Sequence, residues 1–452
     1  MRESVCNPSS ACTLPLNSVI PYLGYQPFPL PPVKSTCLFL VLLLTLCGRN
    51  SADAAPRRDY AEQYRADRQI LVDTRREGDS LRFFLRFPGR AFQPGQLLYV
   101  ASWTSYAAKR PNWQLPVRLR PGHFRQQTDG AWVDIAVLSS RLPAGQLISI
   151  QPSTIPASAI GTKSDGPPLL PPPASDYTDG ALWLQITTAR LQQPYILTDS
   201  LGQPLLRRFV RANEVFGVAS YGTAQPVQVR RYPLSSQPAL PPMSNPAART
   251  HPRTLGLLDS ATYEGGQLLR LTSGLYLLRA SSTALWSGLL VEENQFPELT
   301  SADELIAPLT FLTTSAERKK LFDAPDPKKA VDKFWLDLAG GNQTMARNLI
   351  RTYYDRVMEA NRLFSAHKAG WLTDRGLIYL VMGPPESVYR AASEEQWVYR
   401  SDPDRAATYT FRAKPSTFAP EHYELVRRPE YERLWYAAVE QWRKGITVRT
   451  GR

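Results

Sequence analysis

Residues 370–386 read GWLTDRGLIYLVMGPPE, and the interpretation of the whole C-terminal part of the chain depends on them. The first part of this stretch has the composition of a turn. The side chains of Thr373 and Asp374 can accept hydrogen bonds from nearby backbone N–H groups, and Gly376 can adopt positive φ at no steric cost. The sequence therefore predicts a tight turn at 373–376 that leads into apolar residues.

The second part of the stretch has the composition of a short strand that ends in a rigid turn. Residues 377–381 form an uninterrupted apolar run, which is typical of a buried β-strand. Gly383, Pro384 and Pro385 follow closely, and proline ends a strand because it fixes φ and has no backbone N–H. We therefore expect a strand at 377–381.

Helical patterns precede this stretch and strands follow it. In a capping box a hydroxyl and a carboxylate each satisfy a free backbone N–H, and two such boxes predict the starts of short helices. They are Ser301 with Glu304 and Thr314 with Glu317. Two longer amphipathic helices are expected between 326 and 340 and between 344 and 364. Further strands at 396–399 and 408–411 predict a small mixed sheet, which the two long helices cover.

Two interpretations of residues 370–386 differ in the role of the polar side chains. In the structural one, Trp371 packs on the helix pair as a plug and Asp374 forms a fixed ion pair with Arg375. In the catalytic one, Asp374 or Glu386 acts as a general acid or base, and His367 is the histidine near in sequence. The cleft would be lined by Trp371, Asp374, Arg375, Tyr379 and Glu386. We favour the structural interpretation.

The stretch also resembles a known family. Residues 370–374 match the motif for which the GWxTD domain family is named, and the resemblance covers about residues 297–447. It is also carried by YYDRV at 353–357, EQWVY at 395–399 and WYAAVEQWR at 435–443. The resemblance implies an exported protein of Gram-negative bacteria with no assigned activity. The residues that we assign a structural or binding role on this basis are Gly370, Trp371, Thr373, Asp374, Arg375, Gly376, Tyr379, Gly383, Pro384, Pro385 and Trp397.

Strand patterns dominate the N-terminal half. Short runs rich in β-branched and aromatic residues, bounded by Gly, Pro and Asp, recur between residues 69 and 150 and again between 182 and 291. This spacing is typical of β-sandwiches. Two proline-rich stretches interrupt the pattern. Residues 166–173 favour extended polyproline and form a stiff break, and residues 233–252 are expected to be a long loop of the second β part.

Composition and charge narrow the class of protein. The 452 residues are 43% hydrophobic and 21% charged, near the average for folded soluble chains. A chain of this length holds about two to four domains. The net charge of +13 is spread along the chain without a dense basic tract, so we expect no nucleic-acid partner. A diffusely basic surface favours loose association with anionic lipid or polysaccharide.

The first 54 residues have the features of a targeting segment. Residues 37–47 read CLFLVLLLTLC, which is too short to span a membrane but suits the core of a signal peptide, with Lys34 on its positive side. The preceding residues are unusual for a signal peptide, which favours a true start at Val33. We expect either lipidation at Cys47 or cleavage after Ala54. An uncleaved N-terminal anchor is the third alternative.

The cysteines and histidines exclude several kinds of catalytic site. All four cysteines lie within the first 47 residues, so the folded part has neither thiol catalysis nor disulfides. The four histidines are His123, His251, His367 and His422. None has the i,i+3 or i,i+4 spacing of helical metal ligands, and we expect no metal and no cofactor. The sequence contains no nucleophile elbow, phosphate-binding loop or dinucleotide fingerprint.

These observations predict a multidomain fold, with β-sandwich-like modules in the N-terminal half and an α+β GWxTD-like domain at the C-terminus. The expected parts are a targeting segment at 1–54, a β-sandwich-like domain at 57–155, a proline-rich linker at 156–178, a second β-sandwich-like domain at 179–297 with its loop at 233–252, and the GWxTD-like domain at 298–452.

The expected function is that of a non-enzymatic interaction or scaffold protein of the cell envelope. We expect location in the periplasm or at the outer membrane, with membrane attachment only through the signal segment or a lipid anchor. Envelope proteins or polysaccharide are the expected partners. The alternatives are a hydrolase of an envelope polymer that uses carboxylates near Trp371, and a glycan-binding module. The sequence indicates neither the particular partner nor the oligomeric state.

Overall fold

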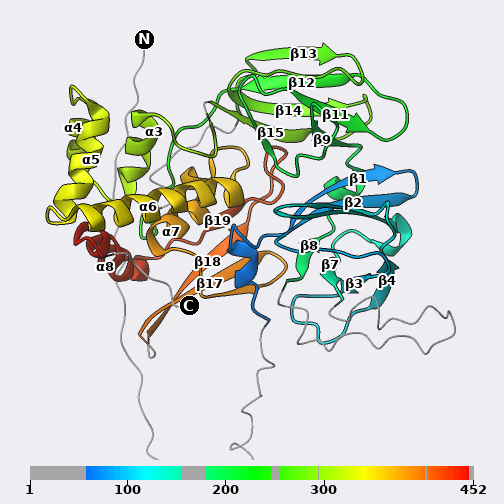
Figure 1. The fold of residues 1–452 in the computed structure, drawn as a ribbon, viewed down its shortest axis with the longest axis horizontal. Coiled ribbons are helices and arrows are strands. Elements are labelled where there is room, and N and C mark those ends of the chain that lie inside the picture. Colours follow the sequence, from blue (N-terminus) through cyan, green and yellow to red (C-terminus); the bar gives the residue numbers. More distant parts are fainter. Residues whose placement is uncertain (1–57, 154–179, 246–253, 294, 403–404, 447–452) are drawn as a thin grey trace, which may run out of the picture. The chain divides into compact units, whose positions relative to one another are not determined.

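The computed structural model describes residues 58–153, 180–245, 254–293, 295–402 and 405–446 (Figure 1). The predictions on Val33, Cys47 and Ala54 and on the proline-rich stretch 166–173 fall outside these residues. Residues 57–452 belong to one unit, in which two β-rich parts precede a part with both helices and strands. Within the described ranges, no helix combines the length and the apolar character needed to cross a membrane.

The first β part is a sandwich of two four-stranded antiparallel sheets, ordered β1-β2-β6-β5 and β4-β3-β7-β8. Strand β2 alternates between buried and partly exposed residues, which is the pattern of a strand with one face in a core. Its inward residues pack with those of β6 on inward residues of β3, β7 and β8. The strands are β1 (Leu71–Glu77), β2 (Ser80–Pro88), β3 (Leu97–Trp103), β4 (Trp113–Arg118), β5 (Phe124–Gln127), β6 (Gly130–Leu138), β7 (Leu147–Pro152) and β8 (Leu182–Gln185).

Strand β8 corrects the expected division between the two β parts. The sequence pattern places residues 182–185 in a second sandwich that begins at 179, but they pair with β7 and extend the first sandwich. The chain between β7 and β8 therefore connects two neighbouring strands of one sheet. Composition could not reveal this, because the partner of a strand is chosen by tertiary packing and not by its own residues.

The second β part places a two-stranded ribbon, β9-β11, on a five-stranded sheet ordered β10-β15-β14-β12-β13. Both contribute to one core, which contains Tyr195, Phe216, Val229 and Leu278. The β10–β15 pair is parallel and the other neighbours are antiparallel. The elements are α2 (Thr188–Gln192), β9 (Tyr195–Asp199), β10 (Phe209–Arg211), β11 (Phe216–Ser220), β12 (Val227–Tyr232), β13 (Asp259–Tyr263), β14 (Gly274–Ala280) and β15 (Ser287–Glu292).

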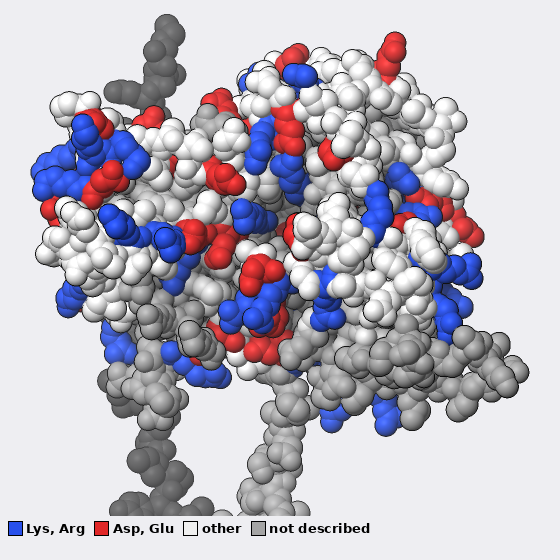
Figure 2. Space-filling view, in the orientation of Figure 1, with Lys and Arg blue, Asp and Glu red and all other residues white. Residues whose placement is uncertain are grey.

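The C-terminal part is α+β, as expected. Both capping boxes are confirmed at the starts of α3 (Ala302–Ile306) and α4 (Ser315–Phe322). The expected long helices are α5 (Pro327–Leu338) and α6 (Gln343–Phe364). Over α4 and α5, Figure 2 shows Lys and Arg mixed with Asp and Glu, and several lysines there pair with an aspartate one turn further on.

The sheet of this part has the order β16-β17-β18-β19 and is antiparallel throughout, so the expected mixed sheet is wrong. The reason is that the apolar run 377–381, which was to supply another strand, belongs to a helix. The strands are β16 (Ser387–Arg390), β17 (Glu394–Asp402), β18 (Arg405–Ala413) and β19 (Tyr423–Leu425), and the remaining helix is α8 (Glu432–Arg443). The expected strands at 396–399 and 408–411 lie within β17 and β18.

Residues 374–382 form helix α7 (Asp374–Met382) and not a turn followed by a strand. Seven consecutive residues from Gly376 to Met382 are buried, so the run is apolar on every side and carries no periodicity that separates helix from strand. The turn chemistry of Thr373 is an N-cap, since its Oγ1 accepts a hydrogen bond from the Gly376 N–H at 3.1 Å. Gly383 ends the helix with φ of 90°, and the prolines follow it.

Candidate functional site

The motif residues form a short turn, η7 (Gly370–Leu372), that leads directly into α7. Two glycines allow this turn to lie against its neighbours. A Cβ on Gly370 would lie 1.9 Å from the carbonyl oxygen of Ala360 in α6, and one on Gly376 would lie 2.0 Å from the carbonyl oxygen of Gly370. Gly376 is therefore required for close packing and not, as expected, for positive φ.

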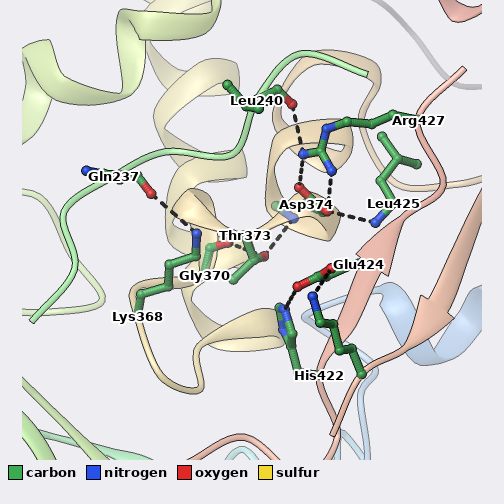
Figure 3. Close-up of polar contacts among 12 residues, drawn as sticks. Gln237, Leu240, Lys368, Gly370, Thr373, Asp374, His422, Glu424, Leu425 and Arg427 are labelled. Atoms are coloured by element: carbon green, nitrogen blue, oxygen red, sulfur yellow. Dashed lines mark hydrogen bonds and ion pairs between the residues drawn. The ribbon is translucent and has the colours of Figure 1, made fainter. Parts of the chain in front are cut away.

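Asp374 is buried at the N-terminus of α7 and is fully engaged (Figure 3). Its Oδ1 accepts a hydrogen bond from Nη2 of Arg427 at 2.6 Å, and its Oδ2 accepts from Nη1 of Arg427 at 3.2 Å. The backbone N–H of Leu425 donates to Oδ2 at 2.7 Å. The bidentate ion pair fixes α7 to β19, and the ion pair expected with Arg375 is wrong.

A segment of the second β part, residues 233–245, lies along the motif. The N–H of Ala239 donates to the carbonyl of Leu372 at 2.9 Å. Nη2 of Arg427 donates to the carbonyl of Leu240 at 3.2 Å (Figure 3). Nζ of Lys368 reaches the carbonyl of Gln237 at 3.3 Å. The described part of the proline-rich loop 233–252 therefore binds the C-terminal part through backbone N–H and carbonyl groups.

The two large apolar residues of the motif, Trp371 and Leu372, differ in how deeply they are buried. Leu372 is 5% exposed and packs in a cluster with Phe209 of β10 and Leu290 of β15. Trp371 is only partly buried, and its ring lies edge-on to Phe311 with the centroids 6.1 Å apart. Its backbone N–H donates to Oδ1 of Asn361 at 3.2 Å. Trp371 packs against the core that contains the helices, as expected, and also against the cluster of Leu372. Leu372 is the more deeply buried of the two and joins the motif to the second β part.

The C-terminal half of α7 is held against α6 by polar contacts. The hydroxyl of Tyr379 donates to Oε2 of Glu359 at 2.8 Å, and burial raises the pKa of that glutamate above its ordinary value. Arg356 is buried, and its Nη1 donates to the carbonyls of Leu380 and Val381 at 3.1 and 3.2 Å. These contacts satisfy the C-terminal carbonyls of α7 with a cation.

Arg375 faces a buried polar network on β16 and β17. Its Nη1 lies 3.8 Å from Oε2 of Glu395, which is 2% exposed. The hydroxyl of Tyr64 donates to Oε1 of Glu395 at 2.5 Å and accepts from Nη2 of Arg390 at 2.6 Å. The indole N–H of the buried Trp397 donates to Oε2 of Glu395 at 3.3 Å. Burial raises the pKa of Tyr64, so its hydroxyl stays protonated as a donor.

Residues 58–64, which include Tyr64 of this network, also contact the first β part. The N–H of Tyr60 donates to the carbonyl of Val388 in β16 at 2.9 Å. The guanidinium of Arg58 lies over the rings of Trp103 and Trp183, 4.5 and 4.8 Å from their centroids. One N-terminal segment therefore contacts both the first sandwich and the C-terminal sheet.

The structure separates the residues of the catalytic interpretation. Asp374 is held by Arg427, whereas Glu386 accepts a hydrogen bond from the backbone N–H of Arg400 in β17 at 3.1 Å. His367 packs on His422, with the ring centroids 4.7 Å apart. Sequence reasoning missed Arg427, the partner of Asp374, because Arg427 stands in no motif. It missed Tyr64 and Arg390 of the buried network for the same reason.

Neither of two pockets found among the described residues includes a residue of the motif. In the same residues, no group of three or more His, Cys, Asp and Glu side chains is arranged to hold a metal ion. The site as described consists of hydrogen bonds, ion pairs and close packing between parts of the chain.

Comparison with known proteins agrees with the motif. Residues 274–444 match the GWxTD domain family, and this part of the chain is therefore a GWxTD domain. The match begins at β14, earlier than the expected residue 298, and so includes β14 and β15 of the second β part. No curated protein matches the chain. The crystal structure of DIP-gamma IG1+IG2 aligns with 50% of this chain and 97% of that chain at 13% identity, with a TM-score of 0.13, which supports no conclusion about fold or function.

Proposed function

We propose that this protein is an exported envelope scaffold in which the GWxTD motif joins the parts of the chain and takes no part in catalysis. The observation that carries the proposal is that both carboxylate oxygens of Asp374 already accept hydrogen bonds. Oδ1 accepts from Arg427, and Oδ2 accepts from Arg427 and from the backbone N–H of Leu425. A general acid or base must present a free oxygen to the substrate, and a buried bidentate pair does not offer one.

Further support comes from the segments that meet at the motif. Leu372 packs on β10 and β15, Ala239 binds the carbonyl of Leu372, and Asp374 binds β19. A motif that fixes three separate segments suits a protein that holds its parts in a set arrangement for partners. The exported location rests on the signal-like residues 37–47 and on the two processing sites, at Cys47 and after Ala54.

The proposal is tested first by location. The intact mass of the protein purified from its native host should correspond to a chain that begins at Cys47 with attached lipid, or just after Ala54. A mass that retains residues 1–40 contradicts export by a cleaved signal. Envelope fractions treated with a crosslinker should then yield a defined protein partner.

The hydrolase alternative is tested by incubation with isolated envelope polymer. Wild-type protein is expected to release no soluble fragments. Release that is lost in Asp374→Asn and in Glu386→Gln, while both variants keep the wild-type melting temperature, would overturn the scaffold proposal.

A further inference from the structure

A concave pocket with a volume of about 240 Å³ lies where the first sandwich meets the β9–β11 ribbon. Its lining includes Phe84 of β2, Trp132 and Asp134 of β6, Arg125 of β5, Arg75 of β1 and Thr198 of β9. Figure 1 shows β1 and β2 lying next to β9 and β11. The pocket is distant in sequence from the motif and does not contribute to the scaffold site described above.

Polar contacts between the two β parts hold the walls of the pocket in place. Nη1 of Arg75 donates to the carbonyl of Ala219 in β11 at 3.2 Å. Nearby, Nη2 of Arg208 donates to Oδ1 of the buried Asp73 at 2.8 Å. The pocket is therefore already formed without a ligand, as binding sites for small molecules usually are.

Two aromatic side chains of the lining are on the outward face of the β1-β2-β6-β5 sheet. Phe84 and Trp132 are partly exposed, whereas their neighbours Leu85 and Val133 point into the core. The indole N–H of Trp132 donates to Oε1 of Gln127 at 2.9 Å, which fixes the plane of the ring. The guanidinium of Arg75 lies over the Phe84 ring, 5.3 Å from its centroid, and that of Arg86 lies 5.9 Å from the centroid of the Trp132 ring. Trp132 is therefore the ring that presents a flat apolar surface of the kind that matches the C–H face of a sugar ring.

The charged side chains of the lining differ in how far they are already paired. Arg75 is bound to Glu77, and Arg82 binds Oδ2 of Asp134 at 2.7 Å. Arg125, the cross-strand neighbour of Trp132, is exposed and makes no ion pair with any described residue. The pocket thus places one uncompensated guanidinium beside an aromatic ring, and Oδ1 of Asp134 makes no hydrogen bond with the residues that the structure describes.

We propose that this pocket binds a uronate residue of an acidic polysaccharide. The sugar ring packs on Trp132, its carboxylate pairs with Arg125, and a hydroxyl donates to Asp134. A planar guanidinium and a carboxylate form two parallel hydrogen bonds, which selects the acidic sugar over a neutral one. This assignment goes beyond the scaffold proposal and does not depend on it.

The test uses the full chain and two probes, an oligogalacturonate and an oligoguluronate, with binding measured by calorimetry at low salt. The wild type should bind at least one of them, and complete methyl esterification of that oligomer should remove most of the affinity. Arg125→Gln should weaken binding by about tenfold to a hundredfold, the range of a lost charge-assisted hydrogen bond. Trp132→Ala should weaken it further.

Arg118→Gln is the matched control, because Arg118 is an exposed arginine of β4 in the other sheet of the same sandwich. It should bind as the wild type does, and all variants should keep the wild-type melting temperature. The proposal fails if neither oligomer binds, if the esterified oligomer binds equally well, or if the Arg125 and Arg118 variants lose affinity alike. Equal affinity for a sugar phosphate would also overturn it, since the pocket would then accept anions in general.

Discussion

Asp374 and Arg427 form a buried ion pair, in which 9% and 11% of the respective side chains are exposed. Such a pair adds little net stability, because removing both charges from water costs about as much as their attraction returns. Breaking it is expensive, since the remaining charge stays buried without a partner. Asp374 is therefore a residue whose loss is costly for structural reasons alone.

Asp374→Asn is expected to lower the free energy of unfolding by about 3 to 5 kcal/mol, because it leaves the Arg427 guanidinium buried without its counter-ion. Glu424→Gln is the control, since Glu424 pairs with Lys414 at 2.7 Å where both side chains are largely exposed. That change should cost about 1 kcal/mol or less. Chemical denaturation measures both. An Asp374→Asn protein as stable as the wild type would return the catalytic interpretation to consideration.

A second prediction at the scale of single residues is that His422 makes the stability of the fold depend on pH. Burial, assisted by the nearby charges of His367, Arg375, Lys368 and Lys414, lowers the pKa of His422 to about 3. The unfolded chain takes up a proton on this side chain near pH 6.5, whereas the folded chain does so only near pH 3. Below pH 6.5 the unfolded chain therefore binds a proton that the folded chain does not bind, and the free energy of unfolding falls progressively as the pH falls.

His422→Gln should make the protein less sensitive to acid. The wild type is expected to lose about 2 kcal/mol of stability through this group between pH 6.5 and pH 5, and the variant should not lose it. Melting temperatures at the two pH values measure the difference. An identical loss in both proteins would mean that His422 is solvated and titrates normally.

At the scale of elements, the motif is a place where η7, α6 and α7 approach one another too closely for side chains. The backbone of Gly370 lies against α6, and its N–H donates to Oγ of Ser365 at 2.9 Å. Thr373 completes the arrangement, because its Oγ1 donates to the carbonyl of Gly370 at 2.7 Å while capping α7. The turn and the helix therefore form as one unit.

Gly370→Ala is expected to destabilise the protein by about 3 kcal/mol, because a methyl group cannot fit against the Ala360 carbonyl without moving the helix. Gly122→Ala is the matched control, since a Cβ there would meet no atom within 4 Å and its φ is not positive. The control should change stability by about 0.5 kcal/mol or less. Equal melting temperatures for the two variants would contradict the close-packing role of Gly370.

At the scale of the whole molecule, contacts between residues far apart in sequence tie the β parts to the C-terminal part. Tyr64 and Glu395, which share a hydrogen bond, are separated by 331 positions. Arg190 of α2 pairs with Glu421 just before β19. Strand β8 belongs to the first sandwich although it follows the proline-rich stretch. These contacts join the three parts from residue 57 onward into one compact unit.

Cleavage within residues 166–173 should therefore leave the two fragments associated. A site for a specific protease placed there allows a single controlled cut. After the cut, the protein should elute as one species on size-exclusion chromatography and give two bands on a denaturing gel, because β7 and β8 remain paired. Elution as two separate species would mean that the proline-rich stretch separates independently folding units.

Local signals determined a large part of this protein from its sequence. The capping boxes at Ser301 and Thr314, the proline at the start of α5 and the amphipathic stripe of α6 predicted those helices, because the information lies within one or two turns of the chain. Short β-rich runs bounded by Gly, Pro and Asp predicted the sandwich character of the N-terminal half for the same reason. The motif itself indicated the GWxTD family.

Tertiary structure alone decided what the motif does. Residues 377–381 belong to a helix that is enclosed on all sides, and an apolar run without periodicity does not distinguish a helix from a strand. Asp374 pairs with Arg427, 53 positions later, and not with its neighbour Arg375. The partner of a buried charge and the sheet that receives a strand such as β8 are set by contacts between distant segments, which no local pattern records.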